Sequence, residues 1–187
     1  MPLLRSISRR LLAPFVRRGH DLARDTAGVT AVEFGLLALP FFTIIFAILE
    51  TAVVFLAGQV LDSAVEDAGR MVRTGRAQNA GFTITEFRNQ LCGLTFGLFD
   101  CSKIRIHVST IGSFGAAAPP PVQDCDEESC EWSEDEAYEA GARRQVVQVA
   151  AYYRWPLVVN LPYFTLRNQP DSYRLLAAVT VFRNEPF

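Results

Sequence analysis

The 187-residue chain contains few of the residues and patterns on which enzymes depend. Only two histidines are present, His20 and His107, and neither lies in a motif with a nucleophile. No glycine-rich phosphate loop follows an expected strand, and the basic residues beyond residue 75 are scattered along the sequence. We therefore expect no enzyme and no catalytic residue, no cofactor, and no nucleotide or nucleic-acid site.

The sequence also lacks a convincing metal site. None of the cysteines forms a CxxC pair, which argues against zinc. Asp124, Asp126 and Glu128 alternate as calcium ligands would, but Ser129 stands where a calcium loop requires glycine. Asp135 replaces the glutamate that would close such a loop. We expect a solvated acidic surface and no bound metal.

Net charge is small, at −2, but its local distribution is informative. The segment before residue 28 contains six arginines and two aspartates. Positively charged segments that flank a membrane helix usually remain in the cytoplasm. The stretch from Phe34 to Leu49 then carries no charge, and with residues 29–33 it reaches the roughly 20 residues that span a bilayer. A buried helix of a soluble protein is the alternative, but PFFTIIFAIL has no polar face. The pattern predicts one inner-membrane helix, with everything after about Leu61 in the periplasm.

The four cysteines all lie in the part expected to be exported to an oxidising space. Cys92, Cys101, Cys125 and Cys130 allow three connectivities. Short loops need little chain ordering, which favours Cys92 with Cys101 and Cys125 with Cys130.

Three regions follow from the hydrophobic pattern: a basic leader (1–28), a long helix (29–75) that continues beyond the membrane, and a head (76–187). Residues 85–91 predict a short helix that Thr83 or Thr85 can cap. Residues 103–110, 144–155 and 173–183 predict antiparallel strands. An acidic segment, 111–142, predicts an irregular loop in which Trp132 and Tyr138 serve either subunit contacts or local packing. The fold class is α+β.

The most informative stretch is AGVTAVEFGLL, residues 27–37, which resembles a type IV prepilin junction of the tight-adherence (Flp) subclass. In that family the peptidase cuts after a glycine, with Glu at the fifth and an aromatic at the sixth mature position. Gly28, Glu33 and Phe34 match, although Phe34 replaces the tyrosine of the major pilins. The TadE-like proteins of the same system follow with an apolar helix bearing a proline and a later glutamate, which Pro40 and Glu50 match.

Physical reasons for this motif stand beside the resemblance. A carboxylate in hydrocarbon is costly, so Glu33 needs a partner or an interfacial position. Cleavage would expose the α-amino group of Val29, which could pair with Glu33 of a neighbouring subunit. Pro40 removes one backbone donor and should kink or loosen the helix. Glu50 either pairs with another subunit or marks the outer edge of the bilayer.

The resemblance implies a pilin-like minor pilin or pseudopilin that acts in biogenesis of a tight-adherence pilus. Its implied partners are a prepilin peptidase cutting between Gly28 and Val29, other pilins and pseudopilins, and the pilus assembly platform; the subunit itself could enter the surface pilus. The alternative is an uncleaved, signal-anchored periplasmic binding or sensing protein. A secreted protein cut by ordinary signal peptidase near residues 56–58 is disfavoured, because no clean A-x-A site is present.

Overall fold

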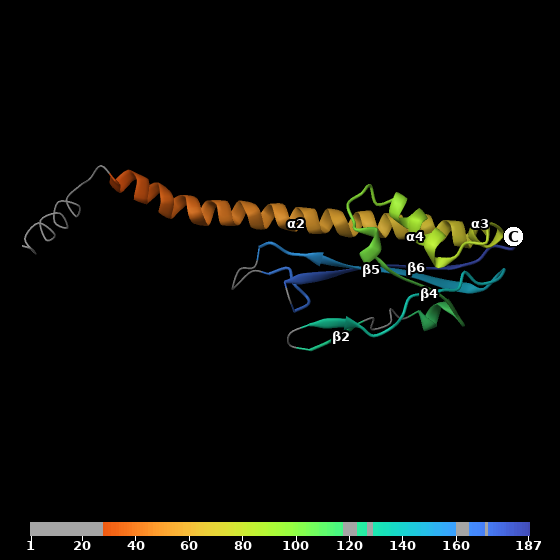
Figure 1. Cartoon of the computed structure of the whole chain (residues 1–187). Coiled ribbons are helices and arrows are strands. Elements are labelled where there is room, and N and C mark those ends of the chain that lie inside the picture. The colour runs from red at the N-terminus through yellow and green to blue at the C-terminus, as the bar shows by residue number, and fades with distance from the viewer. Residues whose placement is uncertain (1–27, 118–122, 127–128, 160–164, 171) are drawn as a thin grey trace, which may run out of the picture. The chain divides into compact units, whose positions relative to one another are not determined.

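The computed structural model describes residues 28–117, 123–126, 129–159, 165–170 and 172–187. The predicted leader, apart from Gly28, lies outside these described residues, as does Glu128. The chain divides into two compact units, Met1–Phe46 and Ala47–Phe187. The second unit contains the end of the long helix together with the whole head (Figure 1).

Helix α2 runs from Val29 to Arg73 over 45 residues, which confirms the predicted long helix. Within the second unit it buries a stripe at helical spacing: Val54, Ala57, Leu61, Ala64, Val65, Ala68 and Val72. Small side chains in this stripe allow the helix to approach the sheet closely. A Cβ added at Gly69 would lie 3.0 Å from side-chain carbons of both Phe182 and Thr180 on the last strand, so helix and sheet are in tight contact.

The C-terminal tail of the chain contacts the C-terminal end of α2. Gly75 adopts a left-handed conformation with φ of 76°, which suits the residue just past a helix. The backbone N–H of Glu185 donates to the carbonyl oxygen of Arg73 at 2.9 Å. A four-residue helix α3, Arg76–Asn79, follows. Helix α4, Ile84–Gly93, then begins with a capping box between Thr83 and Glu86, so Thr83 is the cap.

Four strands form the main sheet in the order β4-β1-β5-β6 (Figure 1). Strands β1 (Arg105–Ile111), β5 (Val146–Pro156) and β6 (Tyr173–Arg183) pair antiparallel, which confirms the α+β fold class. Strand β4, Ala137–Tyr138, adds in parallel to β1. A separate hairpin joins β2 (Gln123–Cys125) to β3 (Cys130–Trp132), and short 3-10 turns η2 and η3 cover Cys101–Lys103 and Phe114–Ala116.

The described parts of the acidic segment 111–142 include short strands. It contains β2, β3 and β4, so the prediction of an irregular loop was wrong for these short pieces. They are two or three residues long, too short to show a period in the sequence. Figure 1 shows the hairpin across the sheet from α2, and the core lies between α2 and the sheet face carrying Ile106, Val149 and Ala178.

Two disulfides fasten the head. Cys92 at the end of α4 is joined to Cys101 of η2, and Cys125 to Cys130 across the β2–β3 hairpin. Each closes a loop of fewer than ten residues, the arrangement that low ordering entropy favours. The second bridge holds the two strands of the hairpin in register.

Two tyrosines should make the stability of the head depend on pH in alkaline solution. Burial, with a smaller contribution from Glu86, raises the pKa of Tyr138 to about 12, and burial also raises the pKa of Tyr152. Because the folded pKa exceeds the unfolded one, their stabilisation is present below pH 10 and is lost as pH rises toward 12. We expect unfolding free energy to fall across this window by about 1 kcal/mol, discounted for partial exposure.

Tyr138→Phe tests this expectation. The hydroxyl is buried without a hydrogen-bond partner among the described residues, and its ring packs 5.3 Å from Phe87, so phenylalanine should preserve the packing. Urea unfolding at pH 7, 10 and 12 should give a flatter profile for the variant. An unchanged slope between pH 10 and 12 would show that Tyr138 does not titrate as described.

Candidate functional site

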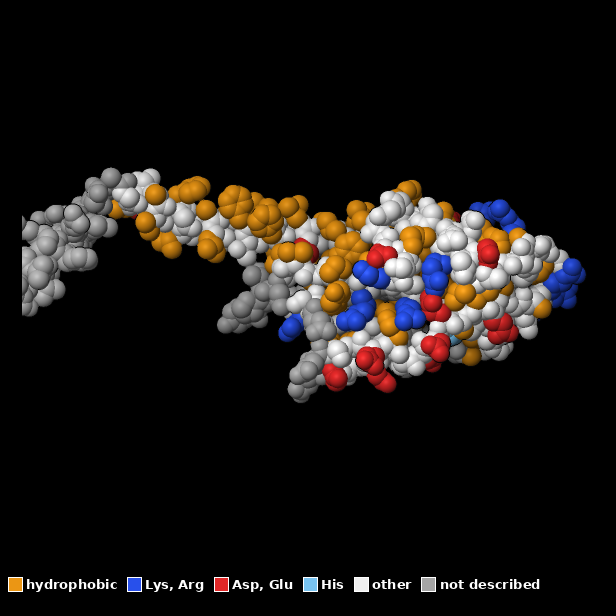
Figure 2. Space-filling model, in the orientation of Figure 1, with side chains coloured by type: hydrophobic (Ala, Val, Ile, Leu, Met, Phe, Trp, Pro, Cys, Tyr) orange, Lys and Arg blue, Asp and Glu red, His pale blue; other side chains and the backbone are white. Residues whose placement is uncertain are grey.

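The first part of α2 exposes an apolar surface in this single chain. Gly28 and Val29 are both exposed at the start of the helix, and Phe34 is 70% exposed. Large apolar side chains remain exposed along the helix: Val32, Leu36, Leu37, Leu39, Phe41, Phe42, Ile44, Phe46, Ile48 and Leu49. Figure 2 shows hydrophobic side chains, in orange, gathered along this part of the helix. Among the described residues, α2 is the one helix long and apolar enough to cross a membrane.

Glu33 is the charged residue within this apolar surface. Its side chain is exposed, and no hydrogen bond or ion pair joins it to another described residue. A carboxylate surrounded by exposed hydrocarbon side chains requires a partner or water when the helix is buried in lipid. The surface around Glu33 is therefore suited to contact with another molecule. Helix α2 also continues without interruption past Pro40, which stays exposed.

Glu50 has a different role, inside the second unit. Its carboxylate accepts hydrogen bonds from the backbone N–H groups of Val158 and Val159, the latter at 3.0 and 3.1 Å to its two oxygens. These residues follow directly after β5, so Glu50 fastens the end of that strand to α2. The sequence suggested an edge of the bilayer or a partner subunit for Glu50; this intramolecular clamp was not foreseen.

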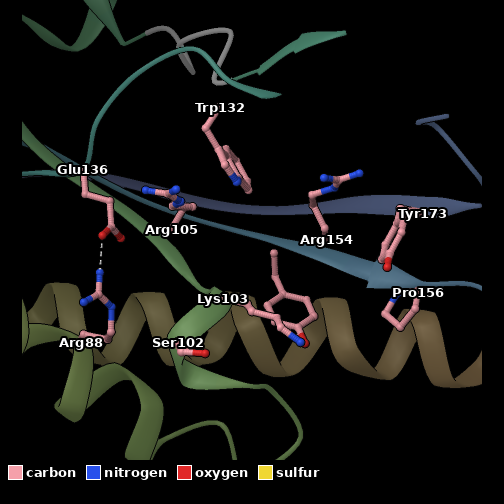
Figure 3. A pocket seen from close by; sticks show the side chains of 10 residues that line it. Arg88, Ser102, Lys103, Arg105, Trp132, Glu136, Arg154, Pro156 and Tyr173 are labelled. Carbon is pink, nitrogen blue, oxygen red and sulfur yellow. Dashed lines mark hydrogen bonds and ion pairs between the residues drawn. The ribbon is translucent and has the colours of Figure 1, made fainter. Parts of the chain in front are cut away.

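A groove of about 720 Å³ opens on the head (Figure 3). Its lining combines cationic and aromatic side chains from several elements: Arg88, Lys103, Arg105, Arg154, Trp132, Tyr153 and Tyr173, with Ser102, Glu136 and Pro156. Arg88 comes from α4, Lys103 from η2, and Arg105 from β1. The fold thus gathers four positive charges that the sequence scatters over 67 positions.

Most cations of the groove have partners within the head, and Lys103 pairs with Asp100 at 3.1 Å. Arg88 forms an ion pair with Glu136, the one carboxylate of the lining, and Glu136 also accepts from the backbone N–H of Ile106 at 3.0 Å. Arg105 stacks on Trp132 with its guanidinium carbon 5.4 Å from the ring centroid, and no carboxylate in the described chain pairs with it. Arg154 stacks on Tyr173 at 4.8 Å. Arg154 also donates to the side-chain oxygen of Gln169 at 3.2 Å and to the carbonyl oxygen of Cys130 at 3.3 Å.

Comparison with known families identifies the character of the segment 28–70. A family model described as TadE-like protein matches residues 28–70. This segment is TadE-like. The match confirms the resemblance predicted from Gly28, Glu33, Phe34, Pro40 and Glu50, and it relates the chain to tight-adherence pilus systems, whose TadE-like members are structural or assembly components rather than enzymes. No curated protein and no solved structure gives a significant match to the chain.

The TadE-like match ends before the head, so the head's features depend on the structure alone. No group of three or more metal-ligating side chains occurs within the described ranges. His107 lies 3.8 Å from Glu134 beside the groove and has no nucleophile among its described partners. Tyr138 packs locally against Phe87, whereas Trp132 lines the groove.

Sequence reasoning missed the groove for a physical reason. Four cations on separate elements show no periodicity, and only the pairing of β1 with β5 brings Arg105 close to Arg154. The alternating pattern of these strands could have indicated the shared face. Arg105 is paired with Tyr152, and Arg154 lies two residues farther along β5, so both arginines project from the same side of the sheet.

Proposed function

We propose that this protein is a minor pilin or pseudopilin of a tight-adherence pilus, made with a leader that a prepilin peptidase removes after Gly28. The observation that carries the proposal is the TadE-like segment itself: Gly28 precedes an exposed apolar helix with Glu33 at its fifth position. In this proposal the helix is held in the inner membrane, the arginine-rich leader is cytoplasmic, and the head is periplasmic.

Cleavage and assembly are connected through charge. Removal of residues 1–28 would leave Val29 with a free α-amino group at the positive end of the helix dipole. Glu33 of an adjacent subunit can then form a charge-assisted pair with that amino group, which fixes the relative height of two packed helices. The exposed hydrocarbon around Glu33 supplies the packing surface for this contact. Other pilins and the assembly platform are the partners that such a surface fits.

Processing is tested by replacing Gly28 with leucine. A side chain at Gly28 would meet nothing within 4 Å, so any effect should arise at the peptidase and not in the fold. We expect Gly28→Leu to abolish cleavage, because a bulky residue prevents close approach of the peptidase to the scissile bond. The measurement is the N-terminal sequence of the protein from native membranes, with and without the cognate peptidase.

Gly35→Leu is the matched control, because a side chain at Gly35 also meets nothing within 4 Å. That variant should be processed normally and start at Val29. An intact leader in the unmodified protein would contradict the pilin proposal and support the signal-anchored binding protein. A start at Val29 that does not require the peptidase would contradict it equally.

A further inference from the structure

The exposed apolar side chains of α2 do not end at Glu50. The second unit carries them on both sides of this residue: Ile48, Leu49, Val53, Phe55 and Leu56. The first charged residue after Glu50 is Asp62. A bilayer is crossed by about 20 helical residues, so a span that begins just after Glu33 ends near Val53. In the proposed membrane orientation, Glu50 therefore lies just inside the outer boundary of the hydrocarbon.

Glu50 holds a second segment of the chain at the same level. Its carboxylate accepts hydrogen bonds from the backbone N–H groups of Val158 and Val159, in the connection between β5 and β6. In hydrocarbon, a lone carboxylate and lone backbone N–H groups are each costly, and here they satisfy one another. The hydroxyl of Thr51, next to Glu50, likewise donates to the carbonyl oxygen of Ala47 at 2.7 Å. These polar groups are paired within the chain and need no water.

The side chain of Val158 is left uncovered by the described chain. It is 91% exposed, although its backbone N–H is hydrogen-bonded to Glu50 of α2. Arg167, in the same β5–β6 connection, is exposed and takes part in none of the described salt bridges. An apolar side chain at the depth of the acyl chains suits lipid, and a nearby arginine in the same connection can extend to lipid phosphate.

We propose that the β5–β6 connection of the head enters the outer leaflet at Val158, and that the lipid bilayer is the partner that covers this residue. The contact rests on the proposed membrane span of α2 and adds a second attachment of the head to the bilayer. Lipid is the occupant because Val158 continues the exposed apolar surface of α2, the helix that is long and apolar enough to cross a membrane. Two attachments restrict tilting of the head, since tilting would move Val158 from hydrocarbon into water.

Fluorescence quenching by a nitroxide-labelled lipid tests the contact in the full chain. All four cysteines form disulfides, so a single added cysteine can be labelled selectively with a fluorophore. Val158→Cys replaces an exposed side chain and should not disturb the fold. The labelled protein is placed at low density in liposomes of phosphatidylcholine and phosphatidylglycerol. A nitroxide just below the headgroup should quench this fluorophore several-fold more strongly than one attached to a part of the head outside the bilayer.

Two matched positions calibrate the depth. Phe114→Cys replaces an exposed apolar side chain beyond the C-terminal end of β1, at the opposite end of the sheet from Val158, and should be quenched weakly. Phe46→Cys replaces an exposed side chain within the expected span and should be quenched strongly by a nitroxide placed deeper in the acyl chains. Adding Glu50→Ala should lower the quenching at Val158→Cys several-fold, because the clamp is lost, and should leave the quenching at Phe46→Cys unchanged. Circular dichroism of each variant verifies that the head remains folded.

The outcomes separate this contact from the proposed function. Strong quenching at Phe46 with equally weak quenching at Val158 and Phe114 would overturn the lipid contact and leave the membrane helix intact, with water or another subunit covering Val158. Weak quenching at all three positions would refute the membrane span and the contact together. An unchanged signal from Val158→Cys in the Glu50→Ala background would show that Glu50 does not hold the connection in lipid.

Discussion

Gly75→Ala should lower the unfolding free energy of the head by more than about 2 kcal/mol, because two costs combine at this residue. Gly75 has φ of 76°, a conformation that residues with a Cβ adopt unfavourably. The new Cβ would also lie only 2.6 Å or less from three ring carbons of Phe187. The ring must move away, and the tail that caps α2 through Glu185 loses its packing.

Gly81→Ala is the matched control. Gly81 has a similar φ of 67°, but an added Cβ meets nothing within 4 Å. This variant should cost only the conformational penalty, about 1 kcal/mol. Denaturant unfolding of Gly75→Ala in a Phe187→Ala background should then give a cost close to that of Gly81→Ala. A cost that does not change in that background would show that Phe187 is not the obstructing group.

Most of the fold could be predicted because its main elements are long and periodic. The apolar run after Gly28 and the amphipathic stretch up to Val72 define α2. Strand β1 alternates along its seven residues, whereas β5 and β6 are eleven-residue runs rich in β-branched and aromatic side chains. The short strands could not be predicted in the same way. β2 and β3 are three residues long and joined by the Cys125–Cys130 bridge, and β4 is two residues long beside β1, so none of them shows a period in the sequence.

The candidate functional residues show the same contrast, because some could be found in the sequence and others only in the structure. The prepilin-like residues Gly28, Glu33 and Phe34 lie within seven residues of sequence, so a motif reveals them. The groove cations depend on strand register and on the packing of α4 and η2 beside the sheet. Glu50 illustrates both cases, because its place in the helix was visible in the sequence, whereas its partners lie 108 and 109 residues later.

Two glutamates of α2 should respond oppositely to the same mild substitution. Glu33→Gln removes a charge from a side chain that contacts no described residue, so the folding stability of the head should not change. Glu50→Gln removes the charge that accepts two backbone N–H groups, and should destabilise the head by about 1–2 kcal/mol. Thermal unfolding of the two purified full-length variants measures this difference.

In assembly, Glu33→Gln should have the larger effect and Glu50→Gln the smaller one. If Glu33 pairs with the Val29 amino group of a neighbouring subunit, Glu33→Gln should reduce co-purification with other pilins about tenfold, since a charge-assisted pair in lipid is lost. Glu50→Gln, which retains the helix surface, should co-purify at nearly the normal level once corrected for protein abundance. N-terminal sequencing of both variants separates assembly from processing. Normal co-purification of correctly processed Glu33→Gln would refute the pairing and leave hydrocarbon packing of α2 as the sole basis of the helix contact.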